Sequence, residues 1–264
     1  MTKKTLTKLL VTVMTYPHPS TAYQELVCAA GITEECQWVR LYPVDYRYRP
    51  RKQRFHKYQW VEVELEDRGE GNDNRKESRR PSLDTLRVLG EPLSTEDGWR
   101  ARREVIDRVP HRTLNELKAL YDSDRTSLGI VRPSKVLDLE IAPAEQDWKP
   151  EWQELFLQLR LFGESQKPLR KLPFEFRFVF ECPDSDKPHT ATILDWELGV
   201  LFLKESERLQ SDDEAAKSVK RKYMEEMCSP ERDTRFFMGT RFPFNAWMVL
   251  GVFWPPKTYQ RAIF

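Results

Sequence analysis

Residues 36–66 read CQWVRLYPVDYRYRPRKQRFHKYQWVEVELE, and they contain two strand patterns joined by a dense basic and aromatic stretch. In the first pattern Val39 and Leu41 alternate with Arg40, so one strand face is predicted to be apolar and the other to hold the cation. The second pattern, residues 58–66, alternates in the same way. Several short strands with tight turns predict a small barrel or sandwich in this part of the chain.

Similar patterns extend on both sides of this stretch. Residues 174–182, FEFRFVFEC, alternate most strongly, with Phe174, Phe176, Phe178 and Phe180 predicted to face the interior. Further strands are predicted at residues 7–16, 24–30, 127–132, 135–142, 235–240 and 246–254, and helices at 99–108, 113–121, 148–162, 195–209 and 211–227.

The order of these elements divides the chain into two β-rich parts. We expect an N-terminal domain over residues 1–145, a helix and linker over 146–173, and a C-terminal domain over 174–264 with two inserted helices. The basic, proline-containing stretch GESQKPLRKLP at 163–173 is the predicted joint. The fold class is therefore expected to be α+β, mainly β.

The composition of the 264 residues limits the classes of function. A hydrophobic content of 39%, with eight Trp and fourteen Phe, argues against a disordered chain. The net charge is only +1, so any nucleic-acid surface must be a local patch. No run of about 18 apolar residues occurs, so no membrane span is expected. Four Cys without a C-x-x-C pair predict reduced thiols and a cytoplasmic protein.

The segment Trp38–Tyr58, called the basic-aromatic segment below, carries seven Lys or Arg residues against one acid. Guanidinium groups offer paired donors to phosphates, and aromatic faces can stack on unpaired bases. A barrel rim with core rings and solvated cations is the alternative. The groove that we predict for nucleic acid is lined by Arg40, Tyr42, Tyr46, Arg47, Tyr48, Arg49, Arg51, Arg54 and Lys57.

A polar loop at residues 67–81 holds a second charged cluster. Three of its cations are predicted to extend the phosphate track: Arg75, Arg79 and Arg80. Asp73 and Glu77 could position those cations, ligate a metal together with further ligands, or form ion pairs within a solvated loop. Near the C-terminus, Arg235 and Arg241 form a smaller basic-aromatic group. The alternative is that they are residues at the rim of a hairpin and bind nothing.

Signals of catalysis are weak in this sequence. Asp195 and Glu197, with His189 upstream, could form a carboxylate–histidine site, but a helix cap explains Asp195 more simply. No H-E-x-x-H, Walker A or G-x-S-x-G motif occurs. We therefore expect no catalytic residues, no cofactor and no resident metal, and a binding protein rather than an enzyme.

Several segments carry a resemblance to a known family: LVTVMTYPHPSTAYQELVCAAGI, WVRLYPVDYR, FHKYQWVEVEL, DNRKESRRP, LPFEFRFVF with DWE, and RFFMGT followed by WMVLGVFWPP. Together they resemble the dual OB-containing domain proteins of bacteria and archaea over nearly the whole chain. The resemblance implies two small OB-like β-barrels with helical insertions, and a nucleic-acid role in prokaryotic defence. It implies no catalytic residues. The short RFPF connection departs from the longer basic loop expected there.

Three functions follow from these observations. The leading hypothesis is a protein that binds single-stranded DNA or RNA as a subunit of a defence or other nucleoprotein complex. The second is a protein-binding adaptor that uses the charged helix 211–227 and the apolar tail Tyr259–Phe264. The third is a metal-dependent nuclease that uses Asp73, Glu77, Asp195 or Glu197.

Overall fold

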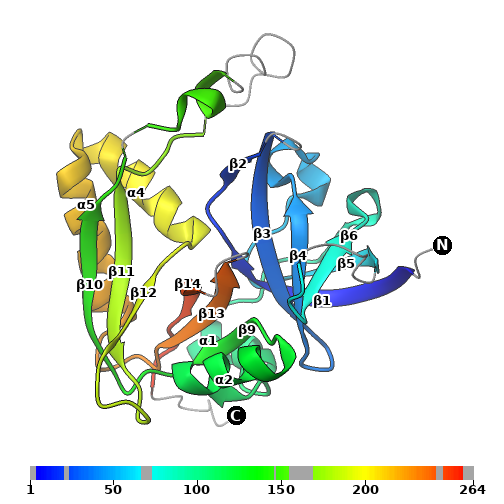
Figure 1. Ribbon diagram of the computed structural model, residues 1–264. Coiled ribbons are helices and arrows are strands. Elements are labelled where there is room, and N and C mark those ends of the chain that lie inside the picture. Colours follow the sequence, from blue (N-terminus) through cyan, green and yellow to red (C-terminus); the bar gives the residue numbers. More distant parts are fainter. Residues whose placement is uncertain are drawn as a thin grey trace.

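Five strands of the N-terminal part close into a mixed β-barrel in the computed structural model (Figure 1). They are β1 (Lys4–Met14), β3 (Gln24–Thr33), β4 (Trp38–Val44), β5 (Gln59–Glu66) and β6 (Ser78–Pro81). Their order around the barrel is β1-β3-β4-β6-β5, and β5 returns to β1. Only the β4–β6 pair is parallel among these five contacts. The structure describes residues 4–20, 24–66, 73–145, 147–154, 169–241 and 246–257.

The predicted alternation of the barrel strands is present. Along β5, Val61, Val63 and Leu65 are buried, and the intervening residues are half-buried. The strand β6, which closes the barrel between β4 and β5, was wrongly predicted as part of a polar loop, because its sequence, SRRP, has no apolar alternation. Two short strands, β2 (His18–Ser20) and β7 (Arg87–Leu89), extend the sheet beyond the barrel, and the 3-10 turn η3 (Leu83–Thr85) lies before β7.

The second part contains two sheets that do not close. One has the order β10-β11-β12, with β10 (Lys135–Pro143), β11 (Phe174–Glu181) and β12 (His189–Thr192). The other has the order β14-β13-β9-β8, with β14 (Ala246–Phe253), β13 (Arg235–Arg241), β9 (Leu128–Val131) and β8 (His111–Arg112). The prediction of a second barrel is therefore wrong for the described residues. An α+β, mainly β fold with one barrel is confirmed.

The two open sheets share one core. Phe178 of β11 stacks on Phe236 of β13 with ring centroids 4.6 Å apart, and Phe176 and Phe180 are also buried. Helices α4 (Trp196–Leu209) and α5 (Asp212–Arg221) pack beside the β10-β11-β12 sheet (Figure 1), and α5 continues into the π-helical turn η4 (Lys222–Met227). Apolar helix faces thus bury the sheet where a barrel would have placed more strands.

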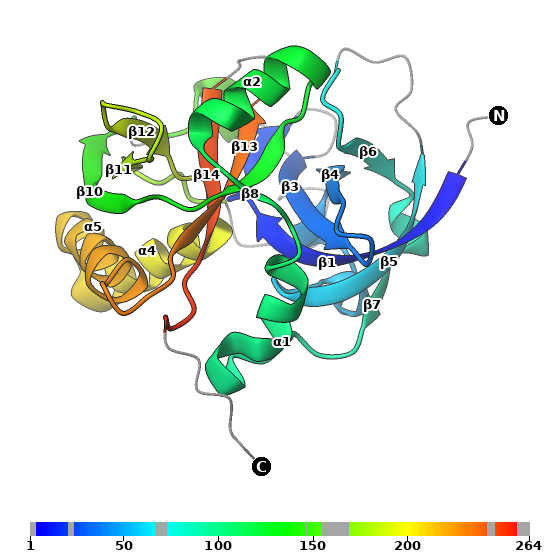
Figure 2. The same cartoon turned by 90° about the horizontal axis from the view of Figure 1, so that it is seen from below.

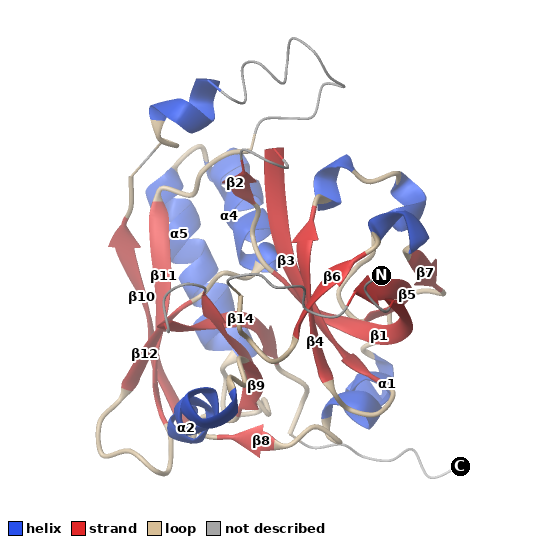
Figure 3. Ribbon diagram, turned by 45° about the vertical axis from the view of Figure 1, so that its right-hand side comes forward, coloured by secondary structure: helices blue, strands red, loops and turns tan. Residues whose placement is uncertain are grey.

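Helix ends follow the predicted capping chemistry. Thr113 accepts from the backbone N–H of Glu116, and the Glu116 carboxylate accepts from the Thr113 N–H, which completes a capping box at α2 (Leu114–Asp124). Asp195 caps α4 by accepting from the Glu197 N–H, and Ser211 caps α5. The helix α1 (Glu96–Ile106) lies below the barrel in Figure 3.

The barrel and the four-stranded sheet pack directly against each other, as the view from below shows (Figure 2). Ala30 and Ile32 of β3 share a buried cluster with Leu128 of β9 and Leu250 of β14, and the rings of Trp38 and Phe237 lie 5.9 Å apart. The outer face of β3 and β4 is therefore largely an internal interface.

Some predictions fall on residues outside the described ranges. Residues 150–154 are helical, but most of the predicted helix 148–162 and half of the predicted joint 163–173 are not described. The strands β9 and β10, which precede that joint, pair with β13 and β11, which follow it. No helix of the described residues is long and apolar enough to span a membrane.

Candidate nucleic-acid interface

The basic-aromatic segment leaves β4 and reaches β5 through two short 3-10 turns, η1 (Tyr46–Tyr48) and η2 (Arg51–Gln53). The Tyr46 and Phe55 rings meet edge to face with centroids 5.2 Å apart, and the Tyr46 hydroxyl donates to the Phe55 carbonyl at 2.6 Å. Phe55 is 1% exposed and belongs to the barrel core. Part of the predicted aromatic surface therefore faces inward.

Two arginines of this segment have carboxylate partners. Arg47 donates two hydrogen bonds to Glu25, at 2.8 and 2.9 Å. Burial raises the pKa of Glu25, and the adjacent Arg47 guanidinium opposes that rise. Arg49 pairs with Asp45 at 2.7 Å and with Asp84 at 3.1 Å. These pairs cancel much of the charge that the sequence gathers here.

Lys57 connects the barrel to helix α4. Its ammonium group is 3.1 Å from an Asp195 carboxylate oxygen and 2.8 Å from one of Glu197. Both Lys57 and Asp195 are buried, whereas about half of the Glu197 side chain is exposed. Burial alone would lower the pKa of Lys57, but the two carboxylates hold it above its ordinary value. The cluster is a charged joint between two parts of the fold.

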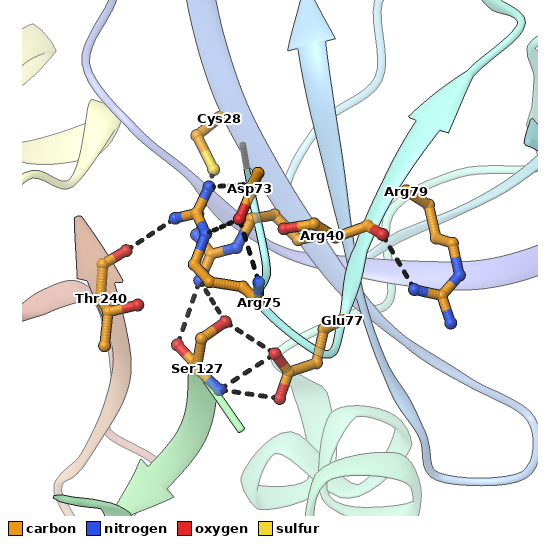
Figure 4. A network of polar contacts seen from close by, with 9 residues as sticks. Cys28, Arg40, Asp73, Arg75, Glu77, Arg79, Ser127 and Thr240 are labelled. Carbon is orange, nitrogen blue, oxygen red and sulfur yellow. Dashed lines mark hydrogen bonds and ion pairs between the residues drawn. The ribbon is translucent and has the colours of Figure 1, made fainter. Parts of the chain in front are cut away.

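Arg40 lies in a buried polar network between β4 and β9 (Figure 4). Its guanidinium donates to the Ser127 carbonyl at 3.0 Å, to the Ser127 hydroxyl at 3.2 Å and to the Cys28 sulfur at 3.3 Å. Because Arg40 is 1% exposed, it cannot contact a nucleic acid in this arrangement.

The predicted phosphate track at residues 75–80 belongs partly to the same network. Arg75 is buried, pairs with Asp73 at 2.7 Å and donates to the Thr240 carbonyl at 2.9 Å. Glu77 is also buried and accepts from the Ser127 N–H and hydroxyl. These side chains join the loop to β9 and β13 (Figure 4).

Of the two arginines in the C-terminal basic group, one is buried and paired and the other is exposed. Arg235 is buried, donates to Asp233 at 2.6 Å and pairs with Asp107. Arg241, at the end of β13, is exposed. Its charge contributes to lowering the pKa of the nearby His18, although burial is the larger cause.

The other predicted residues are exposed or half-buried. Tyr42 is 44% exposed, and Tyr48 hydrogen-bonds Glu25. Arg54 donates to two backbone carbonyls within its own segment. They lie on β4, η1, η2, directly after η2 and on β6, and none of them lines any of four cavities formed by described residues: Tyr42, Tyr48, Arg51, Arg54, Arg79 and Arg80.

A different concave surface lies between the basic-aromatic segment and α4. A cavity of about 380 Å³ is lined by Tyr46, Lys57, Arg102 and Lys204, among others, and one of about 580 Å³ by Tyr16, Arg47 and Arg170. Trp196 and Val200 line both. We call these two adjoining spaces the Trp196 cavities.

Aromatic rings form the shared wall of the Trp196 cavities. The Trp196 ring is 5.3 Å from the Tyr46 ring and 6.5 Å from the Tyr16 ring, centroid to centroid. All three residues are half-buried. Around them, Arg102 stacks on the Tyr58 ring at 3.9 Å, and Lys204 is exposed without a charged partner among the described residues. Half-exposed rings beside cations suit a flat, anionic ligand.

Tyr46, Arg47 and Lys57 of these cavities are among the residues predicted from the sequence, whereas the residues on the other side are not. Trp196 lies between Asp195 and Glu197, whose carboxylates were the predicted feature of this segment. The signal available in the sequence was a Trp directly after the capping Asp195, in the first turn of an amphipathic helix. Nothing in the sequence brings residues 16, 102 and 204 together, because only the tertiary fold does so.

Two family models match this chain. A model for a domain of unknown function (DUF8757) matches residues 110–264, which is more than half of the chain. The chain belongs to the DUF8757 family. A second model, for a domain of unknown function (DUF8758), matches residues 5–108 and so covers the barrel. The DUF8757 region contains both open sheets and helices α2, α4 and α5. A search of curated proteins found no match.

Proposed function

We propose that this DUF8757 protein binds single-stranded DNA or RNA at the Trp196 cavities, as an accessory subunit of a defence or other nucleoprotein complex. One observation carries the proposal: the rings of Tyr16, Tyr46 and Trp196 line adjoining cavities that Arg102, Arg170 and Lys204 flank. Stacking on such rings contributes about 1–3 kcal/mol per base without requiring a particular sequence.

The topology of the barrel is consistent with a nucleic-acid ligand, but the face that usually binds one in OB-folds is covered here. Five strands in the order β1-β3-β4-β6-β5 are consistent with an OB-like barrel, in which the second and third strands usually bind oligonucleotides. Here those strands are β3 and β4, and β9, β13 and β14 cover much of their outer face. The proposed ligand therefore lies beside η1 and α4 instead.

The charges at this surface set a modest affinity. Arg47 and Arg170 have acidic partners, Glu25 and Asp212, while Lys204 has none among the described residues. Neutralising about three phosphates would give a slope near −2 for log affinity against log salt concentration. We expect binding that is visible at low salt and weak at physiological salt.

Fluorescence anisotropy of labelled single-stranded DNA and RNA, measured over a salt series, tests the proposal. The substitution Lys204→Glu should weaken binding about fivefold to tenfold at low salt, because it replaces a phosphate contact with a repulsive charge. The matched control is Lys52→Glu, an exposed lysine beside a cavity on another side of the barrel. It should change affinity less than twofold beyond the effect of net charge.

Two results would contradict this assignment. If Lys204→Glu and Lys52→Glu weakened binding equally, the contact would be a diffuse charge effect rather than this surface. If the wild-type protein bound neither strand at low salt, the nucleic-acid function itself would be wrong. Circular dichroism of each variant checks that the fold is intact.

A protein partner is the second candidate, and β1 supplies the observation in its favour. Residues Lys4–Lys8 pair with β5 on one side, but β3 pairs with β1 only from Leu9 onward among the described residues. Leu6, in this half-paired stretch, is 59% exposed. An extended segment of another protein could add to this edge. A stoichiometric partner that survives nuclease treatment and is lost in Leu6→Lys would support the adaptor function.

The geometry gives the nuclease alternative no comparable support. Asp73 is bound by Arg75 and Glu77 by Ser127, whereas Asp195 and Glu197 share Lys57. These acids form no group of metal ligands in the parts of the chain that the structure describes.

A further inference from the structure

The hairpin loop between β11 and β12 gathers three side chains that are typical metal ligands. Residues 182–189, called the Cys182 loop below, start with a turn in which the Ser185 N–H donates to the Cys182 carbonyl at 3.2 Å. The ligand atoms of Cys182, Asp184 and His189 lie within 4.8 Å of one another. Sulfur, oxygen and imidazole nitrogen ligands in one cluster suit a zinc-like ion.

The imidazole of His189 is an independent sign of a missing ligand. The residue is 9% exposed, and its Nε2 is buried without a hydrogen-bond partner. Buried polar atoms are nearly always satisfied, because leaving one unpaired costs about 1–3 kcal/mol. The unpaired nitrogen belongs to the same residue whose imidazole lies in the Cys182–Asp184–His189 cluster.

The surroundings hold the other two ligands in place. The Thr113 hydroxyl donates to one Asp184 carboxylate oxygen at 2.5 Å, which leaves the other oxygen for a metal. The backbone N–H of Leu114 faces the Cys182 sulfur. Such outer contacts fix the orientation of metal ligands in known sites. Burial raises the pKa of the Cys182 thiol, and the Leu114 N–H and the exposed Lys118 oppose that rise only in part, so metal binding would have to displace the thiol proton.

We propose that Cys182, Asp184 and His189 form a binding site for a divalent ion of the zinc class, independent of the nucleic-acid surface. Binding replaces the thiol proton of Cys182 with a metal–sulfur bond, and the proton passes to solvent. Three protein ligands leave a fourth coordination position for water or an external ligand. The ion would connect the β11–β12 hairpin with the N-terminus of α2, to which Asp184 is hydrogen-bonded.

Cobalt(II) titration of the full-length, chelator-stripped protein tests the site, because cobalt reports its ligands through its colour. We expect one ion per chain, a thiolate-to-cobalt charge-transfer band and the visible bands of four-coordinate cobalt, all removed by added zinc. Cys182→Ser should abolish the charge-transfer band, and His189→Leu should lower the affinity at least 100-fold.

The control variant is Cys228→Ser, which removes a half-buried thiol outside the cluster in the same family region and should leave the spectrum unchanged. Asp184→Asn alters an exposed side chain, so it should fold normally and still lose at least about tenfold in affinity. Weak uptake that is equal in the wild-type protein and all variants, or a charge-transfer band that persists in Cys182→Ser, would overturn the proposal.

Discussion

The basic-aromatic segment and the Cys182 loop differ in a way that their sequences hide. The first is conspicuous, yet Arg47, Arg49 and Lys57 each have carboxylate partners within the fold. The second is inconspicuous, yet the Nε2 of His189 is buried without a partner. A dense cluster of charge in sequence thus indicates a binding surface only if the fold leaves that charge unpaired.

The largest effect should come from breaking a paired charge. In Lys57→Met, the buried Asp195 carboxylate loses its counter-ion, and we expect the free energy of unfolding to fall by about 3–5 kcal/mol. Urea unfolding at pH 7 measures it. The double variant Lys57→Met/Asp195→Asn should recover part of the loss. A single variant as stable as the wild type would show that this cluster is not a structural joint.

A smaller effect is expected from the ion pair at Asp73. The Arg75 guanidinium holds the pKa of Asp73 at about 2, against the cost of burial, whereas the unfolded chain has a value near 3.9. The resulting stabilisation is therefore complete above about pH 4 and is lost as the pH falls towards 2. Because the carboxylate is partly exposed, we expect it to contribute about 1–2 kcal/mol.

Unfolding of the wild type and of Asp73→Asn at a series of pH values checks this difference. The gap between the two proteins should be present at pH 6 and nearly absent at pH 2. A gap that stayed constant over this range would show that the carboxylate charge contributes nothing.

In the Cys182 loop, unlike at Lys57 or Asp73, removing a polar group should not lower the stability of the metal-free protein. In chelator-treated protein, His189→Leu removes an unpaired buried nitrogen, so the free energy of unfolding should change by no more than about 1 kcal/mol or increase. Zinc should stabilise only the wild type, by about 2.7 kcal/mol at a hundredfold excess over its dissociation constant. A large loss without metal would make His189 a structural residue instead.

The smallest effect should come from the exposed end of the basic-aromatic segment. Arg51 lies in η2, is exposed and has no hydrogen bond or ion pair from its side chain among the described residues. Arg51→Glu should change stability by less than about 0.5 kcal/mol. It should also weaken nucleic-acid binding less than Lys204→Glu does. If Arg51→Glu weakened binding more than Lys204→Glu in the anisotropy measurement, the nucleic acid would bind at the basic-aromatic segment instead.

Much of the secondary structure could be predicted from sequence because its signals are local. The alternation of Phe176, Phe178 and Phe180 marks a strand, and Thr113 with Glu116 marks the start of a helix. The strand β6 escaped prediction because its side chains do not alternate and its pairing comes from β4 and β5. The prediction of a second barrel was wrong for a similar reason, because closure of a sheet depends on which strands pair with one another, and those strands lie far apart in the sequence.

The sequence by itself determined most of the longer strands, several helix caps and the gathering of cations and rings at residues 38–58, because period and capping act between near neighbours. Only the tertiary structure decided which of those cations are free. Arg47 meets Glu25 from 22 residues away and Lys57 meets Asp195 from 138 residues away. Electrostatic pairing depends on distance in space and on burial, and neither quantity can be read from positions along the chain.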